Sequence, residues 1–481
     1  MLSLKKNINR QNIRLQKKCF VLIVASLRTQ KTTKFSTGHC GKLVEKLWKT
    51  IGVEKEMNCV ENFLSYPHSY PQSPHYGNIA SSWFSTVSTY TITTTTIYIY
   101  YLIEKVKKMK LICEKDKILK ALNSVTKAVA VRTTMPILEG ILIQTNDTDI
   151  KLTCYDQEVG IEYIINDCNI EEQGATVVNA IMFSEIIRKL PDTDIKITIN
   201  DKNLLVIECE GSLYKLATMN PDEFPELPEI NVENSIELEQ NSLKDMIRKT
   251  IFAVSNEENR PIFTGCLFEV KSNKLNVVAV DGFRLAWKSK VLTTQTNDFT
   301  AVIPGRTLIE VNKIILDSFE TVKVGIAKNQ ALFEIENCKI VTRLLDGEFL
   351  NYSKVIPEKW ETRIRANTSI IADCFERVSL ISSSSIEKEK KYPVKVSGEV
   401  GKITISCTNQ IGDAKEELYV TTEGKNLEVG FNPKYFLDAL KAIDDEEVFV
   451  EFGTSLSPSI IKSVEDTGDY IYMILPIRIQ E

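Results

Sequence analysis

The sequence predicts an α+β fold in which one domain, built of two helices and several strands, is used three times. Three features of the 481-residue chain support this: landmark residues that recur at constant spacing, stretches with apolar residues three and four positions apart, and stretches in which apolar and polar residues alternate. Since a domain takes roughly 150 residues, the chain has room for three.

The landmark residues define three copies in a fixed register. The first and second copies are 125 residues apart at Gly140 and Gly265, Asp156 and Asp281, Asn179 and Pro304, and Phe224 and Phe349. The second and third copies are 128 residues apart at Gly265 and Pro393, Asp281 and Asn409, and Pro304 and Asn432. A constant register at several positions indicates an internal repeat.

Each copy is expected to contain two amphipathic helices among its strands. The first helices are predicted at Lys117–Ala130, Leu243–Val254 and Ser369–Ile381, and the second at Ala180–Leu190, Arg306–Asp317 and Pro433–Ile443. Alternating segments such as DIKITIN and KLNVVAV are predicted to be strands. The proline-rich segments PDEFPELPEI and VIPEKW are expected to link domains at residues 109–232, 233–358 and 359–481.

Charge divides the chain into two different parts. Residues 1–108 contain 16 Lys and Arg against 5 Asp and Glu, the remainder contains 43 against 59, and the whole chain has a net charge of −5. The hydrophobic fraction of 43% is enough to form globular cores. The basic N-terminal stretch and the acidic remainder are therefore expected to behave differently.

Histidine, the commonest general base and metal ligand, is missing after residue 108. The three histidines, His39, His68 and His75, all precede Met109, so a Ser-His-Asp triad or a His-bearing zinc site cannot form within the acidic part. The 11 cysteines are scattered without a CxxC pair, and reduced core cysteines are expected. Because Walker A, GxGxxG and HExxH motifs are also missing, we expect no enzyme, metal or cofactor. A histidine-independent hydrolase remains an alternative.

Basic residues recur on the predicted helices of this acidic part. Arg188, Lys313 and Lys441 occupy one repeat position near the end of the second helix. Lys249 and Arg377 match each other on the first helix, although Ser124 interrupts that set. One interpretation is a solvated helix face that compensates the helix dipole. The other is a track that contacts DNA phosphates without reading sequence.

Several motifs resemble those of the bacterial DNA sliding clamps, the ring-forming beta subunits of the replicative polymerase. They are MKLICEKDKILKAL at Met109, RTTMPILEGILIQ, VAVDGFRLAWKSK, LLDGEFLNYSKVIP, GFNPKYFLDAL and YMILPIRI, and the similarity covers Met109–Ile479 in order. The resemblance implies a head-to-tail homodimer that closes into a ring, with helices lining the hole and sheets outside. It implies a cytoplasmic protein that encircles double-stranded DNA without sequence preference, away from membranes.

The resemblance also implies two sets of binding residues. Arg132, Arg188 and Arg260 match positions that approach DNA, and the repeat register adds Lys313 and Lys441. A hydrophobic pocket between the second and third domains is implied for linear peptides of the replicative polymerase, the clamp loader and other partners. Its matching positions are Phe263, Gly282, Phe283, Arg284, Leu285, Leu350, Lys354, Val355, Asn432, Tyr435, Leu456, Met473, Ile474, Leu475, Pro476, Ile477 and Arg478. Without the resemblance, ordinary core packing would explain the apolar ones.

Three positions near this pocket depart from the family pattern. Val280 stands where the family usually has Thr, Phe283 where His is common, and Lys354 where Arg occurs. The rim of the pocket is therefore expected to be more apolar than usual, and partner preferences are expected to differ.

Residues 1–108 have three interpretations. A signal peptide fits poorly, because the apolar run Thr86–Ile103 lies far from the N-terminus. A transmembrane anchor for an adaptor protein has the right length but many Thr and Tyr residues. The third is translated upstream DNA: SYPH, SYPQ, FST, CGK and LWK are what the replication-initiator box TTATCCACA and its complement encode in different frames. We expect a non-native, disordered extension, with natural translation starting at Met109.

Overall fold

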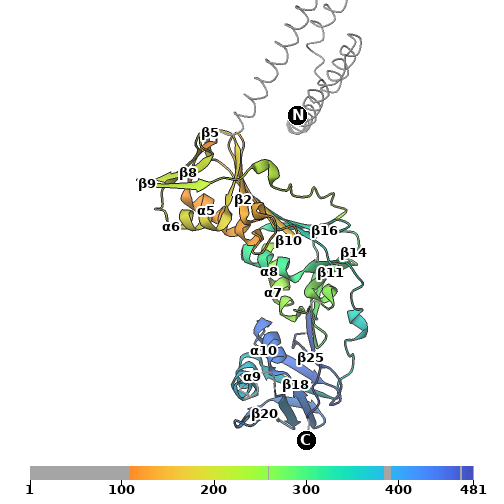
Figure 1. Ribbon diagram of the computed structural model, residues 1–481. Helices are drawn as coiled ribbons and strands as arrows, with labels where there is room; N and C mark the ends of the chain where they lie inside the picture. The colour runs from red at the N-terminus through yellow and green to blue at the C-terminus, as the bar shows by residue number, and fades with distance from the viewer. Residues whose placement is uncertain (1–108, 258, 384–391, 466–467, 480–481) are drawn as a thin grey trace, which may run out of the picture. The chain divides into compact units, whose positions relative to one another are not determined.

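The computed structural model describes residues 109–257, 259–383, 392–465 and 468–479. Within these residues a similar order of helices and strands occurs three times, and the first and third copies have one more strand than the second (Figure 1). The predictions for residues 1–108, including Thr86–Ile103, lie outside them. Across the described ranges, no helix has the length and apolar character needed to span a membrane.

Two helices and a series of strands make up each copy. The first copy contains β1 (Lys110–Glu114), α5 (Lys115–Val125), β2 (Gly140–Thr145), β3 (Ile150–Tyr155), β4 (Val159–Ile165), β5 (Asn169–Glu172), β6 (Ala175–Asn179), α6 (Ala180–Lys189), β7 (Asp194–Ile199), β8 (Leu204–Cys209) and β9 (Ser212–Ala217). The second contains β10 (Asn234–Glu239), α7 (Gln240–Arg248), β11 (Gly265–Lys271), β12 (Lys274–Val280), β13 (Arg284–Val291), β14 (Phe299–Pro304), α8 (Gly305–Ile314), β15 (Thr321–Ile326), β16 (Gln330–Ile335) and β17 (Cys338–Arg343). The third contains β18 (Thr362–Asn367), α9 (Thr368–Ser383), β19 (Val394–Glu399), β20 (Lys402–Thr408), β21 (Asp413–Tyr419), β22 (Thr421–Gly424), β23 (Leu427–Phe431), α10 (Pro433–Ala442), β24 (Glu447–Phe452), β25 (Ser459–Ser463) and β26 (Tyr470–Ile474).

The landmark residues occupy equivalent places in the three copies. Asp156, Asp281 and Asn409 each form the same turn, in which a side-chain oxygen accepts hydrogen bonds from the backbone N–H groups two and three residues later. Asn179 and Asn432 cap the second helix by accepting an N–H from its first turn. The prediction of an α+β domain used three times is confirmed.

Two of the four sheets cross domain boundaries. β17 of the second copy pairs antiparallel with β4 of the first, with Ile340 opposite Ile161, in an eight-stranded sheet. β26 of the third copy pairs with β13 of the second, with Met473 opposite Leu285, in a nine-stranded sheet. The other two sheets have five and four strands and end at β9 and β21 respectively. Each boundary within the chain is therefore bridged by main-chain hydrogen bonds.

The core lies between the helices and the sheets. Helix residues such as Phe183, Leu243 and Phe436 are buried against strand residues. Packing explains the glycine that the first two copies share. A Cβ at Gly265 would lie 2.5 Å from the carbonyl oxygen of Ile303 on β14. The side chain of Leu345 would be almost as close, at 2.8 Å, so no larger residue fits.

Helix ends differ from the predicted bounds by a few residues. The largest difference is at the first helix of the second copy, predicted to run to Val254, where α7 ends at Arg248 and a short 3-10 turn follows at Ile251–Ala253. The Thr250 hydroxyl donates to the carbonyls of Met246 and Ile247, which completes the last turn and stops the helix. The apolar periodicity continues through the 3-10 turn, so the pattern alone overestimated the helix.

Candidate binding surfaces

The turn at Asp281 is the starting point of the predicted pocket. Asp281 Oδ1 accepts the N–H groups of Phe283 and Arg284, both at 3.0 Å, and Gly282 adopts a φ of +91°, which favours glycine. This turn joins β12 to β13 and leaves the Phe283 ring 58% exposed. A large aromatic side chain is thus presented at the boundary between the second and third domains.

Arg284 ties this turn to the third domain. Its Nε donates to Asp281 at 2.8 Å, its Nη1 to Asp438 of α10 at 2.6 Å, and its Nη2 to the Phe252 carbonyl at 2.6 Å. The guanidinium is only 8% exposed and lies 4.7 Å from the centre of the Tyr435 ring. All three guanidinium nitrogens of Arg284 already donate hydrogen bonds within the protein. Arg284 therefore positions the site, and few of its N–H groups remain for a ligand.

Residues from both domains meet around Phe283. Its ring stacks on Tyr435 of α10, with centroids 6.3 Å apart and an interplanar angle of 18°. Its carbonyl accepts the Leu475 N–H at 2.8 Å, directly after the β13–β26 ladder. Burial raises the pKa of Tyr435, with a further contribution from Asp281. The structure therefore brings together Phe283, Tyr435 and Leu475, three residues of the predicted pocket.

A small apolar cluster lies beneath this boundary. Leu285 and Met473 are buried in it, and Phe263 contacts Phe349 edge to face with centroids 5.7 Å apart. Val280, the position where the family usually has Thr, is buried in the same cluster. Four apolar residues of the predicted pocket are exposed by 36–67%: Leu350, Val355, Leu456 and Ile477. Exposed apolar side chains of this kind can bind a partner.

The remaining predicted pocket residues have different environments. Ile474 is 1% exposed and packs in the main core, so it cannot contact a peptide without rearrangement. Asn432 caps α10, Pro476 is half-buried, and Lys354 and Arg478 are exposed. Two surface hollows lie elsewhere, one around the β8–β9 turn and one beside β10, and both are lined mainly by polar and acidic residues. The predicted site thus combines buried apolar residues with exposed apolar residues of the second and third domains.

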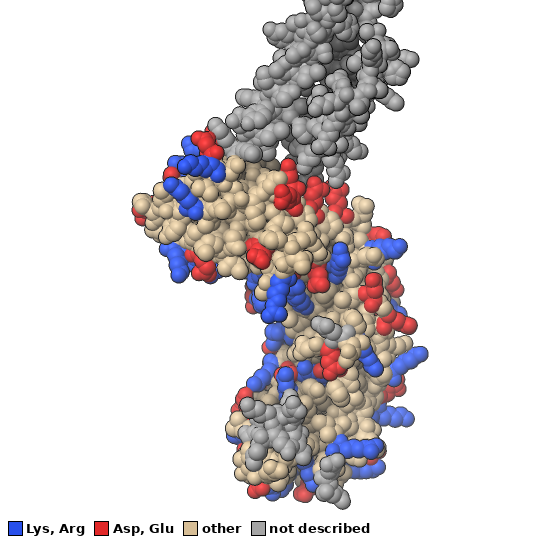
Figure 2. Space-filling view, in the orientation of Figure 1, with Lys and Arg blue, Asp and Glu red and all other residues tan. Residues whose placement is uncertain are grey.

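The predicted DNA-facing residues lie on helices and loops. Arg132 and Arg260 are exposed in the loops that precede β2 and β11. The three residues in repeat register are about half-exposed, and each pairs with a carboxylate: Arg188 with Glu185 at 2.6 Å, Lys313 with Glu310 at 2.9 Å, and Lys441 with Glu376 at 2.8 Å. On the face drawn in Figure 2, basic and acidic side chains are interspersed. Exposed pairs of this kind are weak, so phosphates could replace the carboxylates.

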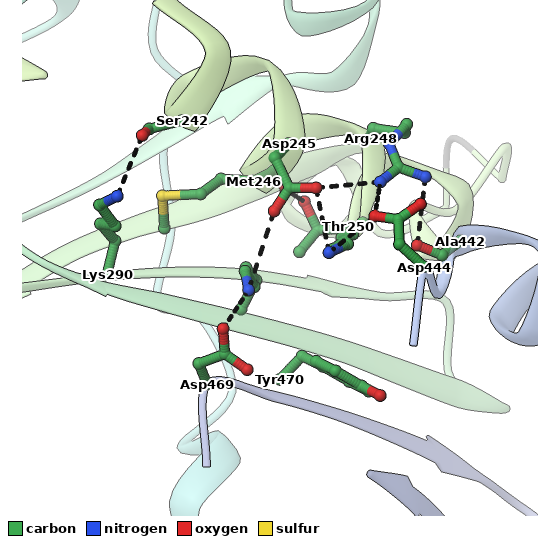
Figure 3. Close-up of polar contacts among 12 residues, drawn as sticks. Ser242, Asp245, Met246, Arg248, Thr250, Lys290, Ala442, Asp444, Asp469 and Tyr470 are labelled. Carbon is green, nitrogen blue, oxygen red and sulfur yellow. Dashed lines mark hydrogen bonds and ion pairs between the residues drawn. The ribbon is translucent and has the colours of Figure 1, made fainter. Parts of the chain in front are cut away.

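Lys249, the other basic residue in repeat register, has a different role. Its side chain is 9% exposed and pairs with Asp245 and Asp444, both at 3.1 Å. Burial lowers the pKa of Lys249, but the two carboxylates outweigh it and raise the pKa overall. It belongs to a charged cluster between the second and third domains (Figure 3). In this cluster Arg248 of α7 pairs with Asp245 and Asp444, and Lys288 of β13 lies between Asp245 and Asp469. Sequence reasoning missed this cluster, since nothing in the repeat marks Lys249 as buried.

The described residues offer no candidate site for a metal ion. Groups of three or more His, Cys, Asp and Glu that could hold a metal ion are not found there. The eight described cysteines are all free and buried, as expected for reduced core residues.

A thrice-repeated α+β domain, with sheets that cross the domain boundaries, an apolar patch at one boundary and basic residues on the helices, defines a DNA clamp. Three family models match in order: the N-terminal domain of the DNA polymerase III beta subunit at residues 109–228, the central domain at 237–351 and the C-terminal domain at 353–478. The chain belongs to the DNA polymerase III beta subunit family, the bacterial beta sliding clamps.

Individual relatives agree. A beta sliding clamp of Staphylococcus epidermidis is 35% identical over 379 residues, covering 77% of this chain and 99% of the relative. A crystal structure of a putative DNA polymerase III beta subunit from Eubacterium rectale is 39% identical, with a TM-score of 0.73, and covers 77% of this chain and 100% of that one. The sliding clamp from Bacillus subtilis is 34% identical with a TM-score of 0.74 and the same coverage.

Proposed function

We propose that this protein is a DNA sliding clamp: two copies close head to tail into a ring around duplex DNA and hold the replicative polymerase on it. It works in the cytoplasm, in contact with DNA and proteins, and without catalysing a reaction. The observation that carries the proposal concerns the strands that join the domains. Two such junctions lie within the chain, and the first and third domains each keep one further junction strand at the edge of a sheet.

These two strands are β9 and β21. Each junction within the chain joins the fourth strand of one copy to the last strand of the next, as β4 joins β17 and β13 joins β26. By the same rule β21, the corresponding strand of the third copy, should pair with β9 of another chain's first copy. Both are edge strands in the isolated chain. Exposed edges attract a further strand, and a head-to-tail contact repeated twice closes a ring.

The repeat also predicts the side chains that would meet there. Phe283 and Tyr435 stack at the junction of the second and third domains, and the repeat register places Ile411 and Met182 at the matching positions. In the single chain these two are 54% and 53% exposed. Tyr214 holds the same place in the β8–β9 hairpin, opposite Ile207, as Ile340 holds in the β16–β17 hairpin, opposite Phe333. Transferring the pairing of Ile340 with Ile161 therefore puts Tyr214 of one copy opposite Ala414 of the other. Apolar residues at a helix start and a turn are well suited to burial in a dimer.

The DNA-contacting residues we infer are Arg132, Arg188, Arg260, Lys313 and Lys441. Their exposure on loops and helices supports contacts with phosphates, and none belongs to a sequence-reading module. The surrounding protein is acidic, with 59 Asp and Glu against 43 Lys and Arg after residue 108. An acidic exterior repels DNA while a basic hole attracts it, so the ring can slide without sequence preference.

The partner-binding site we infer is the apolar patch around Phe283. Leu350, Val355, Leu456 and Ile477 are exposed, whereas Leu285 and Met473 are buried in one apolar cluster. Apolar residues of this kind are suited to the apolar anchors of a short linear peptide. The replicative polymerase, the clamp loader and other DNA-handling proteins would carry such peptides. The exposed Phe283 ring favours peptides with an additional apolar residue beside the anchors.

The proposal is tested by comparing retention of the protein on circular and on linear DNA. A ring loaded on a closed circle stays until it opens, whereas a ring on linear DNA slides off. Retention that does not depend on the ends of the DNA would refute it.

A further inference from the structure

Two buried cysteines of the first domain lie side by side at the end of one strand pair. β1 pairs with β5 so that Leu111 lies opposite Ile170 and Ile112 opposite Asn169. Continuing this register by one residue places Cys113 opposite Cys168. Their Sγ atoms are 3.2 Å apart, and the side chains are 4% and 8% exposed.

The backbone holds both cysteines in this position. Cys113 is paired with Ile195 of β7 on the other side of β1, and the Cys168 N–H donates to the Thr148 carbonyl at 2.9 Å. Directly opposed residues of antiparallel strands have Cα atoms about 4.5–5.5 Å apart, within the range that a disulfide spans. Only the sulfur atoms need to move, from 3.2 Å to a bond of about 2.05 Å.

This thiol pair is unusual within the described part of the chain. The other six described cysteines, which have no sulfur partner at hydrogen-bonding distance there, are Cys154, Cys209, Cys266, Cys338, Cys374 and Cys407. Cys168 also follows the exposed turn of Asn166 and Asp167, so a small oxidant reaches it after a short local opening.

The hydrogen bond between the two thiols makes Cys168 the more acidic sulfur. The hydrogen bond with Cys113 lowers the pKa of Cys168, and Lys117 lowers it further, against the effect of burial. The same hydrogen bond and burial raise the pKa of Cys113. Lys117 is on α5, one turn from Cys113, and pairs with Glu114 at 3.2 Å.

We propose that Cys113 and Cys168 form a redox-sensitive pair that closes to a disulfide when the protein meets a peroxide, locking β1 to β5. The Cys168 thiolate attacks one oxygen of hydrogen peroxide, and the other oxygen leaves as hydroxide and takes up a proton to become water. The Cys113 thiol then displaces the oxygen of the resulting Cys168 sulfenic acid as a second water. The two sulfurs lose two electrons in total, and the peroxide gains them.

The expected consequence is a more stable first domain. The bond closes the chain between residues 113 and 168 and so restricts the unfolded state. Thermal unfolding of the oxidised protein should shift upward by roughly 5 °C, and reduction with dithiothreitol should reverse the shift. Since β5 is at the opposite edge of its sheet from β9, the oligomeric state should not change.

The test uses the full chain, treated with a low concentration of hydrogen peroxide. Free thiols are blocked under denaturing conditions, and the disulfides are mapped by mass spectrometry of peptides. We expect one major cross-link, between Cys113 and Cys168, with a loss of two hydrogens that dithiothreitol restores. Cys113→Ala and Cys168→Ala should abolish both the cross-link and the thermal shift. Cys154→Ala, a fully buried control with no sulfur neighbour, should keep both.

Two outcomes would overturn the proposal. One is a wild-type map in which both cysteines remain free thiols, or are oxidised separately, while circular dichroism shows an intact fold. The other is a cross-link distributed over many cysteine pairs. If the alanine variants fail to fold, the wild-type map decides alone.

Discussion

Lys249, the residue directly after α7, and Asp444, just after α10, form an ion pair of 3.1 Å across the junction of the second and third domains. Arg248 pairs with the same carboxylate. Burial opposes ionisation of Asp444, but the hydrogen bonds from Arg248 and Lys249 outweigh it, so its pKa lies below the usual 3.8. This junction is therefore held by charge as well as by the β13–β26 ladder.

The lowered pKa of Asp444 gives a pH prediction with a defined sign. A carboxyl whose pKa is lower in the folded protein stabilises it above the unfolded pKa, and this contribution is lost as pH falls through the folded pKa. Asp444→Asn should lower stability at pH 7 by about 1 kcal/mol or less, because the carboxylate is largely exposed. The difference from wild type should shrink below about pH 4.

Urea unfolding midpoints at pH 7 and pH 3 measure this effect. Asp317→Asn, at an exposed aspartate after α8, is the matched control and should show no such pH-dependent difference. An Asp444→Asn defect of equal size at both pH values would contradict an electrostatic role.

Peptide binding should depend on the exposed apolar residues of the patch. Leu456→Ala and Ile477→Ala should each weaken binding of a polymerase-tail peptide about tenfold, which corresponds to about 1.4 kcal/mol. Titration calorimetry measures it, and Val400→Ala, at an 88% exposed turn residue between β19 and β20, is the control. Unchanged affinity in both variants would remove the patch as the peptide site. Leu285→Ala should also weaken binding. Because Leu285 is buried, the folding of this variant must be checked.

Binding to DNA phosphates should appear in the salt dependence of the affinity. Lys313→Ala and Arg188→Ala should each reduce the slope of log affinity against log salt by about 0.9 for every phosphate that the variant no longer neutralises. Fluorescence anisotropy with a short duplex at several salt concentrations gives the slope. Lys402→Ala removes a lysine at the start of β20 that pairs with Glu417 of β21 at 3.5 Å, and should leave the slope unchanged. Equal slopes for all four proteins would count against the helix residues.

Dimer formation should depend on the two residues that the repeat places together. Ile411→Asp or Met182→Asp buries a charge in the proposed contact and should convert the dimer to a monomer at micromolar concentration. Light scattering after size exclusion measures the mass. Val400→Asp is the control and should remain dimeric. A dimer that survives both substitutions would place the contact elsewhere.

Sequence reasoning predicted the repeat, because its landmark residues recur in register; the structure then shows what two of them do, a turn at Asp281 and a helix cap at Asn179. It could not predict the burial of Lys249, because the carboxylate that pairs with it, Asp444, comes from another domain. Nor could it separate Ile474, a core residue, from Ile477, an exposed one, since both are apolar and lie in one segment. Long-range packing decides such cases.

The most direct measurement of the central claim compares retention on circular and linear DNA. The labelled protein is loaded on a nicked circle by a clamp loader with ATP, the free protein is removed, and half of the sample is linearised with a restriction enzyme. A topological ring should remain on the circle through repeated filtration in high salt and leave the linear DNA within minutes. Equal loss from the two, or equal retention on both, would contradict a ring that encircles DNA.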